Sequence, residues 1–231
     1  MTITQSRLPK TRPSDRNSTP GGGSIPRKPL LVIAGVIIVA FVALFVVFSF
    51  SNPPGGGGDG FPYAVGNPGP GEEAPPMRLP STDGDTFDLA DARGQRLMLY
   101  FQEGVMCQPC WDQLRDIEAR WDEFAAFDID GAVSITSDPL DVLEGKVALE
   151  GLTTPVLSDP GVEVSATYEA NEYGMMGTSM NGHSFVIVGP DGTIEWRADY
   201  GGAPDYTMYV PVDALLADLG AGLELSPGAA N

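Results

Sequence analysis

The feature that most constrains the fold is an apolar run followed at once by two cysteines and an amphipathic segment. Residues 96–101 read RLMLYF, a run typical of a buried strand, and Cys107 and Cys110 follow in the sequence CQPC. Apolar residues then recur every three or four positions, at Leu114, Ile117, Trp121 and Phe124. This spacing predicts one amphipathic helix over about 108–127. A strand that passes into a helix through a C-x-x-C turn indicates an α/β structure.

The rest of the pattern alternates strands with helices. We predict strands near 87–89, 131–135, 155–157, 184–188 and 193–198, and helices near 138–149, 161–169 and 210–219. The sequence Pro190-Asp191-Gly192 predicts a turn between the last two strands. Helices between the early strands and a hairpin after them favour a central mixed β-sheet flanked by helices.

Residues 30–50 form a run of 21 residues without a charge. In a helix this run rises about 31 Å, close to the hydrocarbon thickness of about 30 Å. It is longer than the apolar region of a signal peptide and has no A-x-A-like end, so we expect a retained transmembrane helix. Six of the 13 Lys and Arg residues precede residue 29, with Asp15 as the only acid there. This asymmetry predicts a cytoplasmic N-terminus and an extracytoplasmic domain in a single-pass protein of the cell membrane.

The segments around this run differ in composition. Residues 1–29 are polar and aperiodic, which predicts a disordered cytoplasmic tail. Residues 51–76 hold seven Pro and eight Gly, which predicts a linker with a coil span of roughly 30 Å. Residues 77–220 remain for one folded domain, and residues 221–231 for a flexible C-terminal end.

The charge of the chain argues against some partners. The formal net charge is -18, and the part after residue 28 is more acidic still because most basic residues precede it. Such a domain is repelled by nucleic acid, so no nucleic-acid partner is expected. The two cysteines lie three residues apart and form no disulfide framework. An exported compartment permits a disulfide between them.

The two cysteines are the candidate chemical centre. Cys107 is predicted at or just before a helix N-terminus, where unpaired N–H groups and the helix dipole favour a thiolate. Cys110 lies one helical turn further on, so its sulfur can reach that of Cys107. Pro109 suits the first turn of the helix. A structural disulfide and a pair of inert buried thiols remain the alternatives.

The strand, the C-x-x-C turn, the helix and the later sequence GHSFVIVGPDGTIEWR together resemble the thioredoxin superfamily over residues 77–220. Within it they are most similar to the redoxins, which include AhpC/TSA peroxiredoxins and membrane-anchored thiol-disulfide oxidoreductases. The resemblance implies that Cys107 is the attacking residue and Cys110 the resolving one, with protein or small-molecule disulfides and thiols as partners and no cofactor.

The resemblance also implies that the loop before strand 184–188 faces the dithiol. Asn181 and Gly182 stand where thioredoxin-like proteins carry a cis-proline, and with Pro109 they are the expected substrate contacts. His183 follows them, and we name it as a third catalytic candidate because an imidazole there could stabilise a thiolate or move a proton.

Other readings of the dithiol remain open. Peroxiredoxins carry P-x-x-x-T-x-x-C, whereas this chain has Tyr100 at the proline position and Gly104 at the threonine position. A thiol-disulfide oxidoreductase is therefore favoured over a hydroperoxide reductase, with an antioxidant role as a nearby variant. A non-catalytic module of this fold that only binds a partner is a further hypothesis.

A copper chaperone of the Sco type is an alternative from another class. Such proteins combine this fold with two cysteines, spaced C-x-x-x-C, and a histidine on the facing loop. Thiolates, imidazole and thioethers together suit Cu(I). The candidate ligands here are Cys107, Cys110, His183, Met176 and Met180.

Overall fold

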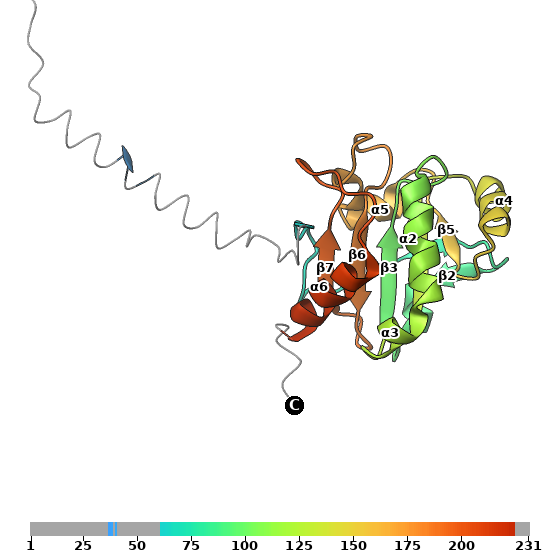
Figure 1. The fold of residues 1–231 in the computed structure, drawn as a ribbon, viewed down its shortest axis with the longest axis horizontal. Coiled ribbons are helices and arrows are strands. Elements are labelled where there is room, and N and C mark those ends of the chain that lie inside the picture. Colours follow the sequence, from blue (N-terminus) through green and yellow to red (C-terminus); the bar gives the residue numbers. More distant parts are fainter. Residues whose placement is uncertain (1–36, 39, 41–60, 225–231) are drawn as a thin grey trace, which may run out of the picture. The chain divides into compact units, whose positions relative to one another are not determined.

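The computed structural model describes residues 37, 38, 40 and 61–224. The folded part is a mixed α/β domain around a sheet in the order β5-β4-β3-β6-β7 (Figure 1). β4 runs parallel to β3, and β5 runs parallel to β4, while β6 and β7 complete the sheet with antiparallel pairings. The strands are β3 (Leu97–Phe101), β4 (Gly131–Thr136), β5 (Val156–Ser158), β6 (Ser184–Val188) and β7 (Ile194–Asp199). The predicted mixed sheet is therefore confirmed.

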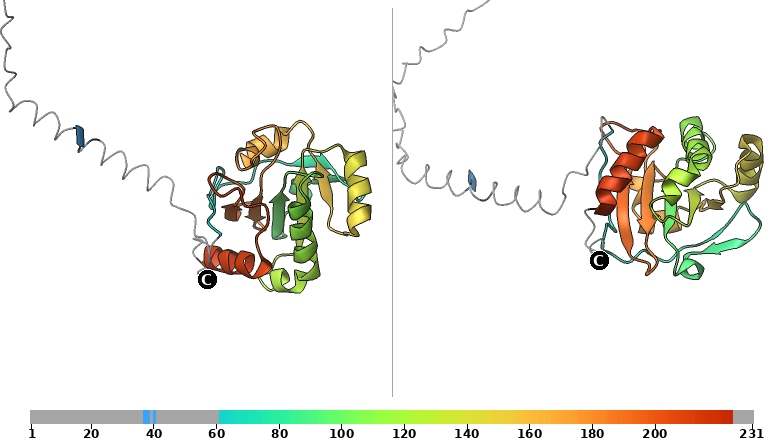
Figure 2. Two further views of the ribbon diagram at one scale, coloured as in Figure 1. Left: turned by 45° about the horizontal axis from the view of Figure 1, so that its top comes forward. Right: turned by 60° about the horizontal axis from the view of Figure 1, so that its bottom comes forward.

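Helices and a small hairpin cover the two faces of this sheet. Figures 1 and 2 show α2 and α6 together over one face, where their apolar side chains join a core cluster with part of α4. The hairpin β1–β2 and the residues around α5 pack on the other face. The remaining elements are β1 (Arg78–Pro80), β2 (Thr86–Asp88), η1 (Leu89–Ala92), α2 (Gln108–Ala119), α3 (Trp121–Ala125), α4 (Leu140–Glu150), α5 (Glu163–Thr167), η2 (Ala170–Glu172) and α6 (Val212–Glu224).

The sequence determines β3 and α2 through local patterns. All five residues of β3 are buried, as expected of a central strand with both faces covered. In α2 the buried positions recur at helical spacing and face the sheet. The predicted helix 108–127 is wrong at one point, because the backbone leaves helical geometry at Arg120 and α3 begins anew. Neither proline nor glycine marks this break, so the sequence carried no signal for it.

The predicted linker is wrong over residues 61–76, which pack along β7. Ala64 pairs with Asp199 through both of their backbone amides, and the amide of Gly71 donates to the carbonyl of Ile194. The buried Arg197 explains how such a Pro- and Gly-rich segment is held. Its guanidinium binds the Asp199 carboxylate through Nε (2.8 Å) and Nη2 (3.0 Å) and donates from Nη1 to the carbonyl of Pro68 (3.0 Å).

The two ends of the chain bear on the other predicted segments. The flexible end predicted at 221–231 is wrong for residues 221–224, which continue α6. Residues 225–231, the tail 1–29 and nearly all of the predicted transmembrane run 30–50 lie outside the described residues. Among the residues that the structure does describe, no helix has the length and apolarity needed to cross a bilayer.

We expect Arg197→Met to destabilise the domain by about 3–5 kcal/mol, because it leaves the Asp199 carboxylate buried without its cation. Arg78→Met is the matched control, since the ion pair of Arg78 with Asp88 is solvent-exposed and should contribute less than about 1 kcal/mol. Urea unfolding of both variants measures the difference. Equal stabilities would show that the Arg197 contact does not hold residues 61–76 in place.

Candidate functional site

Cys107 and Cys110 lie at the start of α2, where the sequence predicted them. Cys107 is the N-cap residue of the helix, and its sulfur accepts a hydrogen bond from the backbone amide of Cys110 at 3.3 Å. The two sulfurs are joined in a disulfide. Pro109 stands in the first turn and is exposed beside them. The unpaired amides of this turn would favour a thiolate on Cys107 once the disulfide is reduced.

The two cysteine residues differ slightly in exposure to solvent. Cys107 is 7% exposed, whereas Cys110 is 0% exposed. The neighbouring Met106 is 86% exposed and marks where the loop meets solvent. Of the two residues, Cys107 thus lies nearer to solvent and Cys110 is fully enclosed.

The loop between β3 and α2 is held by backbone and side-chain hydrogen bonds. The carbonyl of Gly104 accepts from the backbone amide of Cys107 at 3.0 Å and from the indole of Trp111 at 2.9 Å. The carboxylate of Asp138 accepts from the amide of Val105 at 2.8 Å. These contacts fix the turn that carries Cys107 to the tip of the helix.

Gly104 has a conformation that suits glycine and excludes larger residues. Its φ is +95°, and a Cβ added there would lie 1.8 Å from a carboxylate oxygen of Asp138. A threonine at this position would thus meet both backbone strain and a steric clash. The departure from the peroxiredoxin pattern at Gly104 is therefore part of the loop conformation, and Asp138 occupies the space.

His183 is buried and does not touch solvent. The Tyr100 hydroxyl donates to the carbonyl of Cys110 at 3.2 Å and lies 3.0 Å from Nδ1 of His183. A hydroxyl has one proton and a carbonyl only accepts, so Nδ1 carries the imidazole proton and Nε2 is the free base. Burial lowers the pKa of His183 to about 3. The imidazole is thus neutral at physiological pH, so it could act on a thiolate there only as an uncharged group.

Asn181 and Gly182 have internal roles, contrary to their predicted substrate contacts. The Asn181 amide is buried and donates to the carbonyl of Ile135 at 3.1 Å. The backbone amide of Gly182 donates to the carbonyl of Ala170 at 3.0 Å. A Cβ at Gly182 would lie 1.4 Å from the carbonyl oxygen of Tyr173, so glycine is needed for close packing. Both N–H groups are thus bonded inside the domain, and the buried Oδ1 of Asn181 has no hydrogen-bond partner among the described residues.

The copper alternative is not supported by the geometry. The described residues hold no group of three or more His, Cys, Asp or Glu side chains placed to share a metal ion. The Tyr100 hydroxyl lies between the imidazole of His183 and the start of α2, and the two sulfurs are bonded to each other. Met176 is exposed to solvent at 59%. Cys107, Cys110 and His183 therefore do not form such a group in the described residues.

Sequence reasoning missed three residues that shape this site. Tyr100 links α2 to His183, and Asp138 holds the loop before Cys107. The carboxyl of Glu103 accepts from the backbone amide of Met175 at 3.2 Å, and burial raises its pKa. The available signals were a tyrosine, Tyr100, inside a buried strand and an acid, Glu103, just after it. Their partners lie in distant parts of the chain, so the sequence did not show what they contact.

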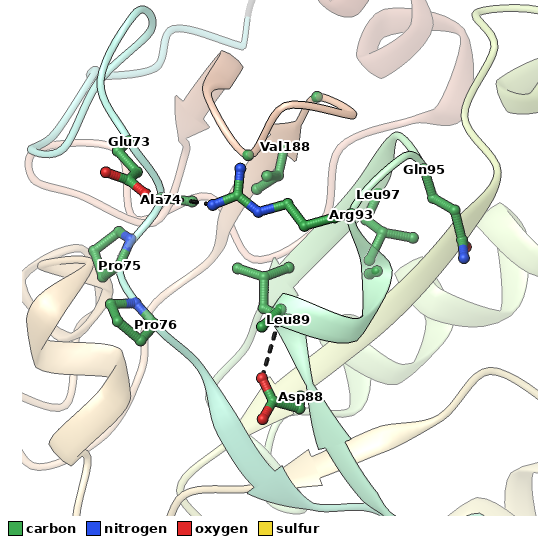
Figure 3. A pocket seen from close by; sticks show the side chains of 14 residues that line it. Glu73, Ala74, Pro75, Pro76, Asp88, Leu89, Arg93, Gln95, Leu97 and Val188 are labelled. Carbon is green, nitrogen blue, oxygen red and sulfur yellow. Dashed lines mark hydrogen bonds and ion pairs between the residues drawn. The ribbon is translucent and has the colours of Figure 1, made fainter.

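A pocket of about 380 Å³ lies at the other end of the sheet (Figure 3). Its lining includes Leu97 and Val188, the first residue of β3 and the last of β6, while the dithiol follows the opposite end of β3. The side chain of Arg93 lies across it and pairs with Glu73 at 3.3 Å. The pocket is thus separate from the cysteine chemistry.

Comparison with known proteins agrees with this geometry. The model of the AhpC/TSA family matches residues 70–197, which include both cysteines and His183. The chain belongs to the AhpC/TSA family. Membership makes it a thiol-dependent oxidoreductase of the redoxin type, whose family chemistry is carried by cysteine rather than by a bound cofactor.

Individual relatives point the same way. A Mycobacterium tuberculosis H37Rv protein named as a peroxiredoxin is 34% identical over 128 residues, covering 54% of this chain and 81% of the relative. Peroxiredoxin Bcp of Escherichia coli K12 is 29% identical over 128 residues, which cover 54% of this chain and 81% of that protein. The crystal structure of peroxidoxin BcpB from M. tuberculosis, at 21% identity, superposes with a TM-score of 0.55 and covers 66% of this chain and 97% of that one. The structural likeness supports the thioredoxin-like fold.

The neutral imidazole gives a pH prediction. The unfolded chain binds a proton at His183 near pH 6.5 and the folded chain only near pH 3, so stability is full above pH 6.5 and falls as the pH drops. Between pH 8 and pH 5 this group should cost the fold about 2 kcal/mol. We expect His183→Asn, which keeps a side-chain N–H donor for the Tyr100 hydroxyl, to lose this dependence.

Urea unfolding at several pH values measures the free energy of unfolding of wild type and of His183→Asn. Carboxyl groups are common to both proteins, so their contribution cancels when the two pH profiles are subtracted. NMR of the single histidine side chain is the direct check. An imidazole that titrates above pH 5.5 would contradict the burial argument.

Proposed function

We propose that this protein is a thiol-disulfide oxidoreductase in which Cys107 attacks the substrate and Cys110 resolves the intermediate. The observation that carries the proposal is the Cys107–Cys110 disulfide at a helix start, in which residue Cys107 is 7% exposed and residue Cys110 is 0% exposed. Family membership supports the class of chemistry. The exposure supports the division of roles.

The reaction passes two electrons between dithiol and disulfide. In the reduced protein the Cys107 thiolate attacks one sulfur of the substrate disulfide and expels the other sulfur as a thiolate. Cys110 then gives up its proton and attacks the sulfur of Cys107. The second substrate thiolate leaves, and the protein disulfide forms. The same steps in reverse oxidise a substrate dithiol.

His183 contributes to this scheme as a positioning residue. Its Nδ1–H donates to the Tyr100 hydroxyl, which donates in turn to the carbonyl of Cys110. These two hydrogen bonds connect His183 to the first turn of α2 and hold the carbonyl of Cys110 in place. The Nε2 atom of His183 has no hydrogen-bond partner among the described residues.

Reduction of hydroperoxides is the second candidate, favoured by the peroxiredoxin relatives. Here the Cys107 thiolate attacks a peroxide oxygen and becomes a sulfenic acid, with release of an alcohol or water. The Cys110 thiol condenses with it to form the disulfide and a second water. A thioredoxin-type reductant then restores the dithiol. The absence of a threonine hydroxyl at Gly104 argues for slow peroxide turnover, because one donor to the peroxide is missing.

We further propose that residues 30–50 anchor the domain to the cell membrane, with the domain on the extracytoplasmic side. The support is the uncharged run and the six basic residues before it. An oxidising compartment would keep the Cys107–Cys110 pair as a disulfide in the absence of a donor. The acidic domain supports the expectation of no nucleic-acid partner.

The dithiol roles are tested by single serine variants assayed with insulin as the disulfide substrate. Cys107→Ser should lower reduction at least about 100-fold, because the nucleophile is gone. Cys110→Ser should instead accumulate a mixed disulfide on Cys107, visible by mass spectrometry under non-reducing conditions. Turnover by Cys107→Ser equal to wild type would reject the oxidoreductase and leave a module that only binds a partner.

The membrane anchor is tested by fractionation of cells that produce the full chain or a chain without residues 30–50. The full chain should stay in the membrane pellet after alkaline carbonate, since a spanning helix is not removed by high pH. Protease added to spheroplasts should digest its domain. Release of the full chain by carbonate, or protection from the protease, would contradict the proposed location.

A further inference from the structure

The pocket of Figure 3 lies between three segments at the end of the sheet opposite the dithiol. These segments are residues 73–76, the stretch from Asp88 to Leu97, and the turn between β6 and β7 with Gly189 and Gly192. Its volume of about 380 Å³ lies within the range of about 300–1,000 Å³ that is usual for small-molecule sites. The chemistry of the cysteines leaves this pocket without a role.

Backbone hydrogen bonds join the three segments, so the pocket is preformed. The amide of Ala74 donates to the carbonyl of Gly192 at 2.9 Å and joins the first segment to the turn. The amide of Gly94 donates to the carbonyl of Pro190 at 2.8 Å and joins the second segment to the same turn. A ligand therefore does not have to order these segments when it binds, which lowers the entropic cost of binding.

Most of the wall of the pocket is apolar. Its apolar side chains include Pro75, Pro76, Leu89, Leu97 and Val188 (Figure 3). Leu97 and Val188 belong to the sheet and are buried, whereas Leu89 is half-buried beside them. An apolar group placed in the pocket would remove part of this wall from water, which favours binding.

The guanidinium of Arg93 lies across this apolar wall (Figure 3). It pairs with Glu73 through Nη2 and Oε1 at 3.3 Å, and the two side chains are 49% and 80% exposed. So exposed an ion pair contributes little free energy, and the guanidinium can exchange this partner for another. Gly192 makes room for it, because a Cβ added there would overlap Nη1 of Arg93. The place of the guanidinium thus depends on this glycine.

The second acid of the wall has partners of its own. The carboxylate of Asp88 accepts from the amide of Ala90 at 3.0 Å and pairs with Arg78 at 3.6 Å. Both ion pairs at the pocket are neutral overall, so the strong acidity of the chain is not repeated there. Arg93 is therefore the group best placed to bind a ligand's charge. The planar fork of its donors matches a carboxylate.

We infer that this pocket binds a small amphipathic carboxylate. Its apolar body lies against Pro75, Pro76 and Leu89, and its carboxylate pairs with Arg93 in place of Glu73. Because Glu73 competes with the ligand for the guanidinium, it limits the affinity of the site. The inference goes beyond the proposed function, since neither cysteine takes part in it.

The test uses three probes that separate the body of the ligand from its charge. The full chain, with its disulfide intact, is titrated while NMR follows the methyl groups of Leu89 and Val188, so that binding elsewhere is not counted. We expect 3-phenylpropionate to bind with a dissociation constant on the order of 1 mM. Its amide, which lacks the charge, and acetate, which lacks the apolar body, should bind at least about tenfold more weakly.

Two variants of the ion pair should act in opposite directions. Arg93→Met should weaken the binding of 3-phenylpropionate at least about tenfold, because the partner of the carboxylate is gone. Glu73→Gln should strengthen it roughly threefold, because the competing carboxylate is gone. Arg120→Met removes the same charge outside the pocket, where Arg120 pairs with Glu123 and Asp213, and should change nothing. A pair that served only the fold would respond alike to both losses.

Several outcomes would overturn the carboxylate site. They are equal binding of 3-phenylpropionate and its amide, equal binding of acetate, and weaker binding by Glu73→Gln. Tighter binding of 3-phenylpropylamine would overturn it too, because the acids of the wall would then select a cation. Methyl signals that do not move with any probe at about 20 mM would show that the pocket does not bind this class. The double variant Cys107→Ser/Cys110→Ser should bind like wild type, so a failure of the proposed function would leave this result unchanged.

Discussion

The antiparallel pairing of β3 with β6 is the constraint on which the rest of the site depends. Because Phe101 pairs with Ser184, the chain that leaves β3 toward the cysteines and the chain that enters β6 after His183 emerge at one edge. One step back in the register, the rings of Tyr100 and Phe185 stack with centroids 4.6 Å apart. This stack presents the Tyr100 hydroxyl to the start of α2. A slip of one residue would turn Tyr100 to the other face of the sheet and leave α2 without that support.

The parts of the fold that sequence patterns predicted are those with a local cause. The buried run of β3, the helical spacing in α2 and the turn at 190–192 each depend on neighbours in the chain, and each is present. The segment 61–76 was wrongly predicted to be a linker because of its Pro and Gly content. That content indicates that a segment lacks helices and strands, but such a segment can still pack against the rest of the domain. Its anchor is the buried Arg197, whose partner carbonyl on Pro68 is 129 residues away in sequence. A contact between such distant residues produces no regular spacing of residue types in the sequence, so the sequence pattern does not predict it.

The contrast between local patterns and long-range contacts also explains which parts of the site could be predicted. The place of Cys107 at a helix start follows from the strand, turn and helix around it, and the sequence showed it. The state of His183 depends on burial against the rings of Tyr100, Phe185 and Tyr200, which come from separate parts of the chain, so its neutral imidazole could not be predicted from one loop sequence. Gly182 looked like a residue that lets a peptide approach, yet it is the backbone of Tyr173 that approaches it. A glycine signals close contact, but its identity alone does not name the partner.

Gly104 and Asp138 together explain why this member of the AhpC/TSA family departs from the peroxiredoxin pattern. The left-handed backbone of Gly104 and the carboxylate beside it depend on each other, since the carboxylate fills the space of a Cβ and binds the next amide at 2.8 Å. Threonine cannot return to this position without moving Asp138 and changing the turn. The loop thus gives up a hydroxyl donor near the sulfur and carries the exposed Met106 to its tip. The surroundings of Cys107 are thereby poorer in groups that polarise a peroxide.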